Sequence, residues 1–167
     1  MRDQADTIAD VTVTDEGGTR ALAGRLALVL AAGDVIALDG TLGAGKTAFA
    51  RALINALPGQ AEDVPSPTFT LVQTYTRGAL DIWHFDLYRL EDAEEAYELG
   101  IEDAFYDAVS LIEWPDRLGA LLPAGHLHVT ISEASGEISG ARRIVIAGNA
   151  EWAGRLADVF EGMAANG

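Results

Sequence analysis

A glycine-rich segment that ends in a lysine and a threonine is the part of this sequence best suited to chemistry. It runs from Gly40 to Thr47 as GTLGAGKT and fits the pattern G-x-x-x-x-G-K-[ST] in full. Glycines let the backbone wrap closely around a phosphate with its N–H groups pointing inward. Lys46 would reach the β- and γ-phosphates of a nucleoside triphosphate, and the Thr47 hydroxyl would ligate Mg²⁺. The segment therefore predicts a P-loop.

The lysine of this segment is the only lysine in the chain. The sequence has eleven Lys and Arg residues, and ten of them are arginines. Phosphate binding in a tight loop requires a compact point charge on a flexible stem, which the planar guanidinium of arginine does not replace. The placement of Lys46 therefore favours a role at phosphate.

A second Mg²⁺ ligand is expected at the end of a neighbouring strand. The apolar run Val109–Ile112 is followed by Glu113, at the carboxyl end where open α/β sheets bind ligands. The alternative interpretation is an ordinary surface glutamate after a buried strand. On pattern alone both interpretations remain open.

The stretch from Leu80 to Arg89 has an unusual division of side chains. In a strand, Trp83, Phe85 and Leu87 would share one face, and the other face would carry His84 and Asp86. This arrangement suits a half-buried strand that lines a cleft. Asp86 would orient the attacking water or hold a water bound to Mg²⁺. For His84 the favoured interpretation is a partly buried histidine with a structural hydrogen bond.

Strand-like and helix-like patterns alternate along the chain, which predicts an α/β fold. We expect one domain over residues 1–167, with 1–10 and 164–167 flexible, in the form of a three-layer P-loop NTPase with a mixed, mostly parallel sheet flanked by helices. Expected strands are 11–13, 35–38, 70–76, 80–87, 108–112, 127–131 and 143–147, with 70–76 and 80–87 forming a hairpin. Expected helices are 19–32, capped by Thr19, then 46–57, 91–99 and 151–163.

Composition narrows the classes of partner and compartment. The formal net charge of −15 disfavours a broad electrostatic contact with nucleic acid or anionic lipid. No apolar run reaches the roughly 18 residues of a membrane span, and the acidic N-terminal residues do not form a secretory signal. The chain has no cysteine, so a disulfide framework is excluded. We expect a cytoplasmic protein that does not bind membranes.

Four motifs, taken in order, resemble those of one family. They are GTLGAGKT at Gly40–Thr47, SPTFT at Ser66–Thr70, HFDLYR at His84–Arg89 and EWPDR at Glu113–Arg117. Together they resemble the TsaE family, the bacterial ATPases of the tRNA threonylcarbamoyladenosine pathway. The resemblance covers roughly residues 11–147, and its last three motifs are more specific than the P-loop.

The resemblance implies binding of ATP and Mg²⁺, with weak hydrolysis by the protein alone. It also implies association with the TsaD–TsaB complex, which modifies adenosine 37 of tRNA, so that tRNA is contacted only indirectly and no metal other than Mg²⁺ is needed. Thr47 and Glu113 would hold Mg²⁺, and Ser66–Phe69 would form a switch-like loop. Lys46, Asp86, Glu113 and Trp114 would be needed for hydrolysis or for coupling to the partner. The nucleotide-binding residues would be Gly43, Ala44, Gly45, Lys46, Thr47, Ala48 and Arg142.

Three details of this resemblance leave alternatives open. Trp114 could equally be core packing, since large aromatic side chains are usually buried for area alone. The segment Thr14–Thr19 resembles the element near the nucleotide base, but Thr19 could simply cap a helix. Either Arg142 or Arg143 would approach the nucleotide, because adjacent residues of a strand point to opposite faces.

Two other functions fit a chain of this size with a P-loop. A small-molecule kinase of the shikimate-kinase type would need an arginine-rich lid, and the sequence after the P-loop helix has only scattered arginines. A nucleotide-dependent binding module would use ATP only to select a conformation. A small GTPase is disfavoured, since its Asn-Lys-x-Asp signature needs a lysine beyond Lys46.

Overall fold

Strands and helices alternate in the computed structural model, which describes residues 5–41, 43–134, 136 and 140–160. The strands are β1 (Asp6–Val13), β2 (Val35–Asp39), β3 (Val72–Arg77), β4 (Leu80–Asp86), β5 (Val109–Glu113), β6 (Leu127–Glu133) and β7 (Arg142–Gly148). The helices are α1 (Glu16–Ala27), α2 (Lys46–Ala56), α3 (Glu95–Glu98), α4 (Ile101–Asp107) and α5 (Ala150–Leu156), with a 3-10 segment η1 (Pro115–Leu121). In the part of the chain that is described, no helix is long and apolar enough to cross a membrane.

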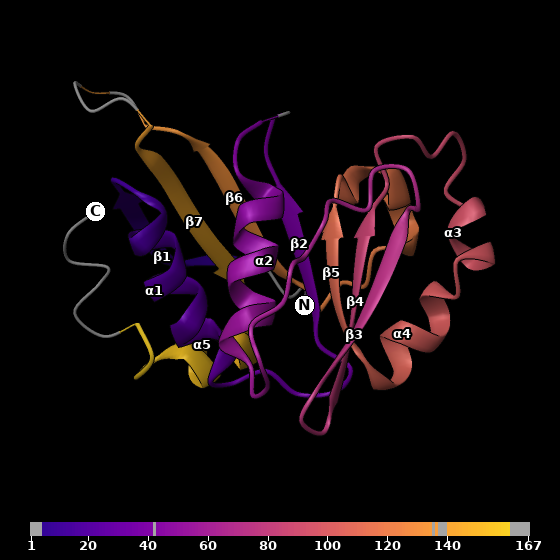
Figure 1. The fold of residues 1–167 in the computed structure, drawn as a ribbon, viewed down its shortest axis with the longest axis horizontal. Helices are drawn as coiled ribbons and strands as arrows, with labels where there is room; N and C mark the ends of the chain where they lie inside the picture. Colours follow the sequence, from indigo (N-terminus) through magenta and orange to yellow (C-terminus); the bar gives the residue numbers. More distant parts are fainter. Residues whose placement is uncertain (1–4, 42, 135, 137–139, 161–167) are drawn as a thin grey trace.

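All seven strands form one sheet, in the order β1-β7-β6-β2-β5-β4-β3 (Figure 1). Five of them run in the same direction, and β3 and β7 run the opposite way. The mixed, mostly parallel sheet and the β3–β4 hairpin are therefore confirmed. Parallel strands β4, β5, β2 and β6 lie together at the centre, which brings their carboxyl ends to one edge.

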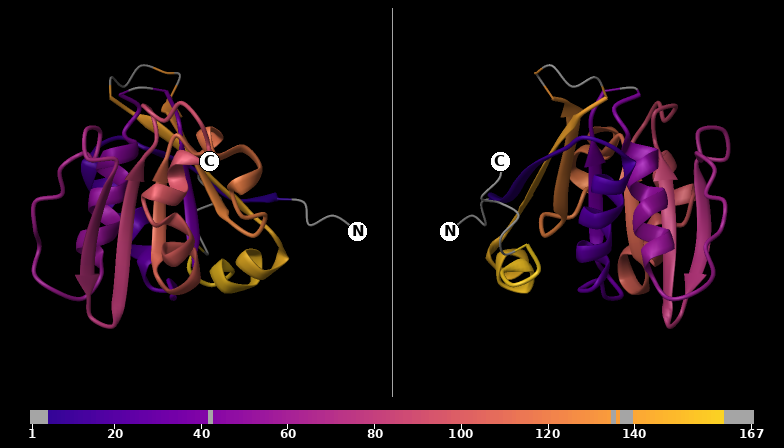
Figure 2. Two further views of the ribbon diagram at one scale, coloured as in Figure 1. Left: turned by 90° about the vertical axis from the view of Figure 1, so that its right-hand side faces the viewer. Right: turned by 60° about the vertical axis from the view of Figure 1, so that its left-hand side comes forward.

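Two hydrophobic clusters lie on opposite faces of this sheet, which makes three layers (Figure 2). One cluster packs α1 and α2 against the strands and includes Leu26, Phe49 and Ile36. The other packs α3, α4 and η1 against the opposite face and includes Ile101 and Val35. Neighbouring residues of β2 thus enter different clusters, since successive side chains of a strand point to opposite faces.

The N-terminal segment departs from the expectation that residues 1–10 are flexible. Residues 6–10 form the first half of β1, which pairs antiparallel with β7. The acidic character of this segment does not prevent pairing, because Asp10 accepts a hydrogen bond of 2.9 Å from Arg143 of the neighbouring strand. Residues 1–4 and the predicted flexible tail 164–167 lie outside the described residues.

The first helix begins earlier than predicted. Asp15 is its N-cap and accepts a hydrogen bond of 3.0 Å from the Gly18 N–H, so α1 begins at Glu16. The prediction that Thr19 caps this helix was therefore wrong. Both residues are good caps by type, and pairing of β1 through Val13 leaves only a short turn in which the helix can start.

The region after β4 is also more broken than predicted. The single expected helix 91–99 is the one-turn α3, and a second helix α4 follows after Gly100. Gly100 has a φ of 81°, a conformation that ends one helix and redirects the chain into the next. The segment η1 was not predicted, because Gly119 argues against a helix. Pro115 is compatible with one only at its first position, which is where it lies.

Arg77 at the end of β3 ties the connection between α2 and β3 to the sheet. Its side chain is 2% exposed, and it donates to the Gln60 carbonyl at 2.7 Å and to Asn55 Oδ1 at 2.8 Å. It also forms an ion pair of 2.8 Å with the partly exposed Glu62. The connection anchored in this way continues into Ser66–Phe69.

Replacing Arg77 with methionine is expected to lower the free energy of unfolding by about 1–3 kcal/mol, since two partly buried acceptors lose their donor. Urea unfolding followed by circular dichroism measures this change. Glu62→Gln is the matched control. It should lower the free energy of unfolding by less than about 1 kcal/mol, because the Glu62 carboxylate is partly exposed and its ion pair with Arg77 contributes little. Equal stability of Arg77→Met and the natural protein would show that these contacts do not hold the connection.

Candidate functional site

The P-loop joins the end of β2 to the start of α2 and passes very close to β6. A Cβ at Gly40 would lie 2.4 Å from the Ile131 carbonyl oxygen, so only glycine fits there. Gly45 has a φ of 112° and precedes α2 without a side-chain cap. The first N–H groups of a helix have no partner within it, and among the described residues those at the start of α2 have no other partner, which suits binding of an anion. Leu42 of this loop lies outside the described residues.

A hollow of about 240 Å³ lies beside the P-loop at the carboxyl edge of the sheet. Apart from Ala44 and Arg142, the predicted site residues line it together with the expected switch loop. Its lining is Gly43, Gly45, Lys46, Thr47, Ala48, Ser66, Thr68, Asp86, Glu113 and Trp114. Residues from four segments of the sequence therefore meet where the P-loop would hold a phosphate.

Glu113 is a buried acid of the site and not a surface glutamate. Its residue is 3% exposed, and Thr47 Oγ1 lies 2.9 and 3.1 Å from its two carboxylate oxygens. In the sheet register, Glu113 of β5 lies beside Leu38 of β2 and Asp86 of β4. Register thus places the end of β5 against both the P-loop strand and the strand that carries Asp86.

His84 was not predicted as a site residue, although it contacts the site directly. It is wholly buried, and its Nε2 lies 2.7 Å from Glu113 Oε2. Because a carboxylate accepts, the Nε2–H donates; Nδ1 has no partner among the described residues. The signal was the shared face of His84 and Asp86 on β4, next to a strand that ends in an acid. A buried donor of this kind orients the carboxylate that it contacts.

Asp86 joins the end of β4 to the expected switch loop. It is 5% exposed and accepts hydrogen bonds from Thr68 Oγ1 at 3.1 Å and from the Tyr88 N–H at 3.0 Å. Thr68 Oγ1 also lies 2.6 Å from Ser66 Oγ. The loop is therefore attached to the site through the Asp86 carboxylate. A movement of the loop would change the hydrogen bonding of this carboxylate.

Lys46 lines the first hollow and is held there by a carbonyl and an aromatic ring. Its Nζ donates to the Gly40 carbonyl at 2.7 Å and lies 3.4 Å from the centre of the Trp114 ring. Burial lowers the pKa of Lys46, and the nearby carboxylates of Glu113 and Asp86 oppose this effect. Trp114 is half-buried and packs against a charged side chain of the site as well as against the core.

A second hollow of about 300 Å³ lies on the other side of the P-loop and includes Thr14, Thr19 and Arg142 in its lining. Arg142 Nε donates to the Ala44 carbonyl at 2.9 Å. Arg143 points to the opposite face of β7 and pairs with Asp10. Of the two arginines, Arg142 is therefore the one beside the P-loop.

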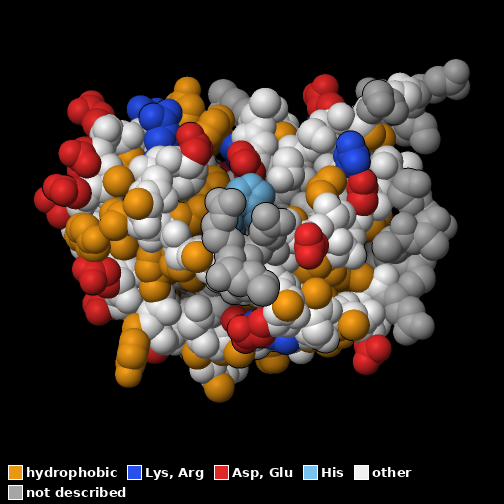
Figure 3. Space-filling view, turned by 180° about the vertical axis from the view of Figure 1, so that it is seen from behind, with side chains coloured by type: hydrophobic (Ala, Val, Ile, Leu, Met, Phe, Trp, Pro, Cys, Tyr) orange, Lys and Arg blue, Asp and Glu red, His pale blue; other side chains and the backbone are white. Residues whose placement is uncertain are grey.

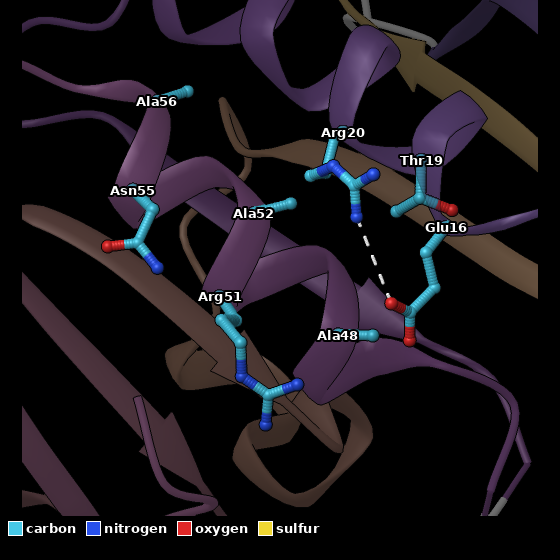
Figure 4. A pocket seen from close by; sticks show the side chains of 8 residues that line it. All are labelled: Glu16, Thr19, Arg20, Ala48, Arg51, Ala52, Asn55 and Ala56. Carbon is cyan, nitrogen blue, oxygen red and sulfur yellow. Dashed lines mark ion pairs between the residues drawn. The ribbon is translucent and has the colours of Figure 1, made fainter. Parts of the chain in front are cut away.

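A third hollow of about 270 Å³ is lined by residues of both α1 and α2 (Figure 4). It shares Glu16, Thr19 and Ala48 with the second hollow. Arg20 and Arg51 extend from the two helices toward it, and Arg20 makes an exposed ion pair of 3.8 Å with Glu16. The lining of this hollow includes none of the predicted catalytic residues.

Mg²⁺ fits the oxygen atoms of the first hollow. Among the described residues no group of three or more His, Asp or Glu side chains could hold a metal ion. Mg²⁺ bound with a nucleotide needs no such group, since it takes most of its ligands from phosphates and water. The hydroxyl of Thr47 and the carboxylate of Glu113 are the oxygen donors that would complete its coordination.

Comparison with known proteins places these features in one family. Residues 13–144 match the family described as "Threonylcarbamoyl adenosine biosynthesis protein TsaE". The tRNA threonylcarbamoyladenosine biosynthesis protein TsaE of Rickettsia conorii is 42% identical over 120 residues, which are 72% of this chain and 69% of that protein. The protein of the same name from Bacillus subtilis is 39% identical over 117 residues, 70% of this chain and 72% of that one. The crystal structure of Bacillus subtilis YdiB superposes with a TM-score of 0.77 at 27% identity, covering 96% of this chain and 97% of that one.

The single lysine allows the state of Lys46 to be measured directly. After reductive ¹³C-methylation we expect one lysine signal besides that of the N-terminus. This signal should lie upfield, since Nζ faces the Trp114 ring at 3.4 Å. Burial should also move its titration midpoint below that of an exposed dimethyl-lysine.

The matched control for this measurement is Trp114→Leu, which removes the ring and keeps an apolar side chain. It should shift the lysine signal toward the position of exposed dimethyl-lysine. A signal at the exposed position in the natural protein would contradict the contact between Lys46 and Trp114.

Proposed function

The chain belongs to the TsaE family, and from this premise we propose that it is a magnesium-dependent ATPase that supports formation of N6-threonylcarbamoyladenosine at position 37 of tRNA. It would do so by acting on the TsaD–TsaB complex. The observation that carries the proposal is the convergence of Lys46, Thr47, Asp86 and Glu113 on one hollow beside the P-loop. The family assignment supports the pathway, and the convergence supports the chemistry.

Binding of the triphosphate would use the backbone of the P-loop and the start of α2. The free N–H groups of α2 would bind phosphate oxygens, and the Lys46 ammonium would leave the Gly40 carbonyl for the β- and γ-phosphates. On the other side of the loop, the hollow lined by Thr14, Thr19 and Arg142 has room for a nucleoside. The base and ribose would therefore lie against α1 and β7.

Mg²⁺, when bound, would neutralise charge on the phosphates during phosphoryl transfer. Thr47 and Glu113 would hold it, and His84 would keep the Glu113 carboxylate turned toward Thr47 through its 2.7 Å contact. Asp86 would accept a hydrogen bond from the attacking water and so orient it for in-line attack on the γ-phosphate. Thr68 contacts the same carboxylate, so the switch loop would close next to this water.

Hydrolysis by the protein alone is expected to be slow. Among the described residues that line the first hollow, none is an arginine. An arginine that reaches the γ-phosphate, or ordering of a switch loop, accelerates P-loop enzymes by about 10³–10⁵-fold. A partner complex that supplies either would make turnover conditional on assembly, which suits a protein that supports another enzyme's cycles.

Replacing Lys46 with alanine should abolish repeated turnover in the modification reaction. The measurement uses purified TsaD–TsaB, its threonylcarbamoyl-adenylate donor and unmodified tRNA, and counts modified tRNA formed per complex. We expect the natural protein to carry the reaction past the first turnover. The Lys46→Ala variant should stop at the first turnover, because it reduces ATP hydrolysis by about 100-fold or more. If neither protein changes the yield, the proposed function is wrong.

Replacing Glu113 with glutamine should raise the Mg²⁺ concentration needed for half-maximal ATPase activity by about tenfold or more, since a charged ligand is lost. A magnesium titration of ATPase activity in the presence of TsaD–TsaB measures this. Ser110→Ala is the matched control, because Ser110 is a buried polar residue of the same strand without a hydrogen-bond partner among the described residues. An unchanged magnesium requirement in Glu113→Gln would sink the assignment of Glu113.

A further inference from the structure

Two aromatic and two arginine side chains form a patch just outside the first hollow. The arginine–aromatic patch consists of Phe69, Tyr88, Arg89 and Arg117. The guanidinium of Arg89 lies 4.8 Å from the centre of the Phe69 ring, and that of Arg117 lies 5.9 Å from the centre of the Tyr88 ring. The patch therefore joins the switch-like loop, the end of β4 and η1, which are distant in sequence.

The side chains of this patch are exposed to solvent and do not serve the packing of the core. Phe69 is 83% exposed and Tyr88 is 42% exposed. Neither Arg89 nor Arg117 forms an ion pair with a carboxylate in the described part of the chain. Exposed aromatic rings and arginines without an ionic partner are the residue types that contribute most to binding at protein interfaces.

We propose that the arginine–aromatic patch docks a protein partner that presents carboxylates around an apolar hollow. In the complex, Phe69 enters the apolar hollow of the partner. Arg89 and Arg117 pair with the partner's carboxylates at the rim of that hollow. Stacking on the rings holds both guanidinium groups in place before binding, so less side-chain freedom is lost in the complex. The proposal rests on the proposed function, because it specifies where the partner of the ATPase binds.

The chemistry of the whole surface favours a protein over RNA at this patch. The chain carries a formal net charge of −15, and acidic side chains are spread over the face in Figure 3, where basic groups are few. Binding of nucleic acid depends on many phosphate contacts, and two arginines in such a chain provide too few. A partner with a small acidic rim needs only these two.

The patch is also connected to the residues that would contact ATP. Tyr88 packs against Trp114 with ring centres 4.9 Å apart, and Trp114 covers Lys46. Phe69 directly follows Thr68, which donates to Asp86. A partner that moves Tyr88 or Phe69 therefore acts on Lys46 and Asp86 through one intervening residue each. These short chains of contacts would couple docking at the patch to ATP turnover in the first hollow.

The test measures binding of TsaD–TsaB and of an ATP analogue to the same variants. Arg89→Glu/Arg117→Glu reverses the charge of the patch, and Phe69→Ser removes the exposed ring. Both should fold normally, since all three positions are exposed. We expect each variant to bind TsaD–TsaB at least tenfold more weakly. The charge-reversed variant, which leaves the switch-like loop intact, should change the dissociation constant for a fluorescent ATP analogue less than twofold. Arg25→Glu, in the last turn of α1 and outside the patch, reverses one charge at an exposed position. This control should bind both as the natural protein does.

The outcomes of this test distinguish failure of the docking surface from failure of the proposed function. Loss of complex binding with retained nucleotide binding supports the docking surface. If the natural protein binds TsaD–TsaB and both variants bind it equally well, the docking surface is wrong and the proposed function stands. If the natural protein does not bind TsaD–TsaB at all, both are wrong. If the natural protein binds free tRNA and the variants lose that binding alone, the patch is a surface for RNA and the protein partner is refuted.

Discussion

The carboxylate of Glu113 is the group on which the arrangement of the site depends. A buried carboxylate is costly unless it is hydrogen-bonded, and Glu113 is only 3% exposed. Thr47 supplies a hydroxyl donor from the P-loop helix, and His84 supplies a ring N–H from the next strand. Three separate segments are therefore fixed relative to one another by a requirement for donors. The same requirement leaves the Glu113 oxygens next to Thr47, where a phosphate-bound cation would share them.

The order and register of the strands explain why these groups meet. Glu113 is level with Leu38 of β2 on one side and Asp86 of β4 on the other. Because all three strands are parallel, their carboxyl ends reach the same edge, and the P-loop leaves β2 at that edge. A shift of one residue in either pairing would turn a carboxylate to the opposite face. Leu111 and Ile112 pack into opposite hydrophobic clusters, so apolar burial alone does not select the register. A shifted register would break the contacts of Glu113 with Thr47 and His84, and these contacts therefore help to fix it.

The sequence predicted the central part of this fold and most of the site, because both depend on short-range patterns. The P-loop and the two strands that end in Asp86 and Glu113 follow from local motifs. The role of His84 did not follow, since its contact with Glu113 depends on which strands are neighbours, and strand order is a property of the whole chain. The choice between Arg142 and Arg143 stayed open for a related reason. Alternation shows that they face apart, and only the pairing of β7 with β1 and β6 decides which one faces the P-loop.

Two residues beside the site have strained backbone conformations. Among the described residues other than glycine, only Leu71 and Trp114 have positive φ values, of 69° and 59°, a conformation that costs about 1–3 kcal/mol at such residues. The Leu71 carbonyl accepts from the Asp86 N–H at 2.9 Å, and the Trp114 ring lies over Lys46. Both strained residues are thus held by contacts to groups that would act on ATP. Trp114 is also the N-cap of η1, and its carbonyl accepts from the Arg117 N–H at 3.1 Å. The turn that follows β5 therefore maintains this conformation, and it leaves the Trp114 ring over Lys46.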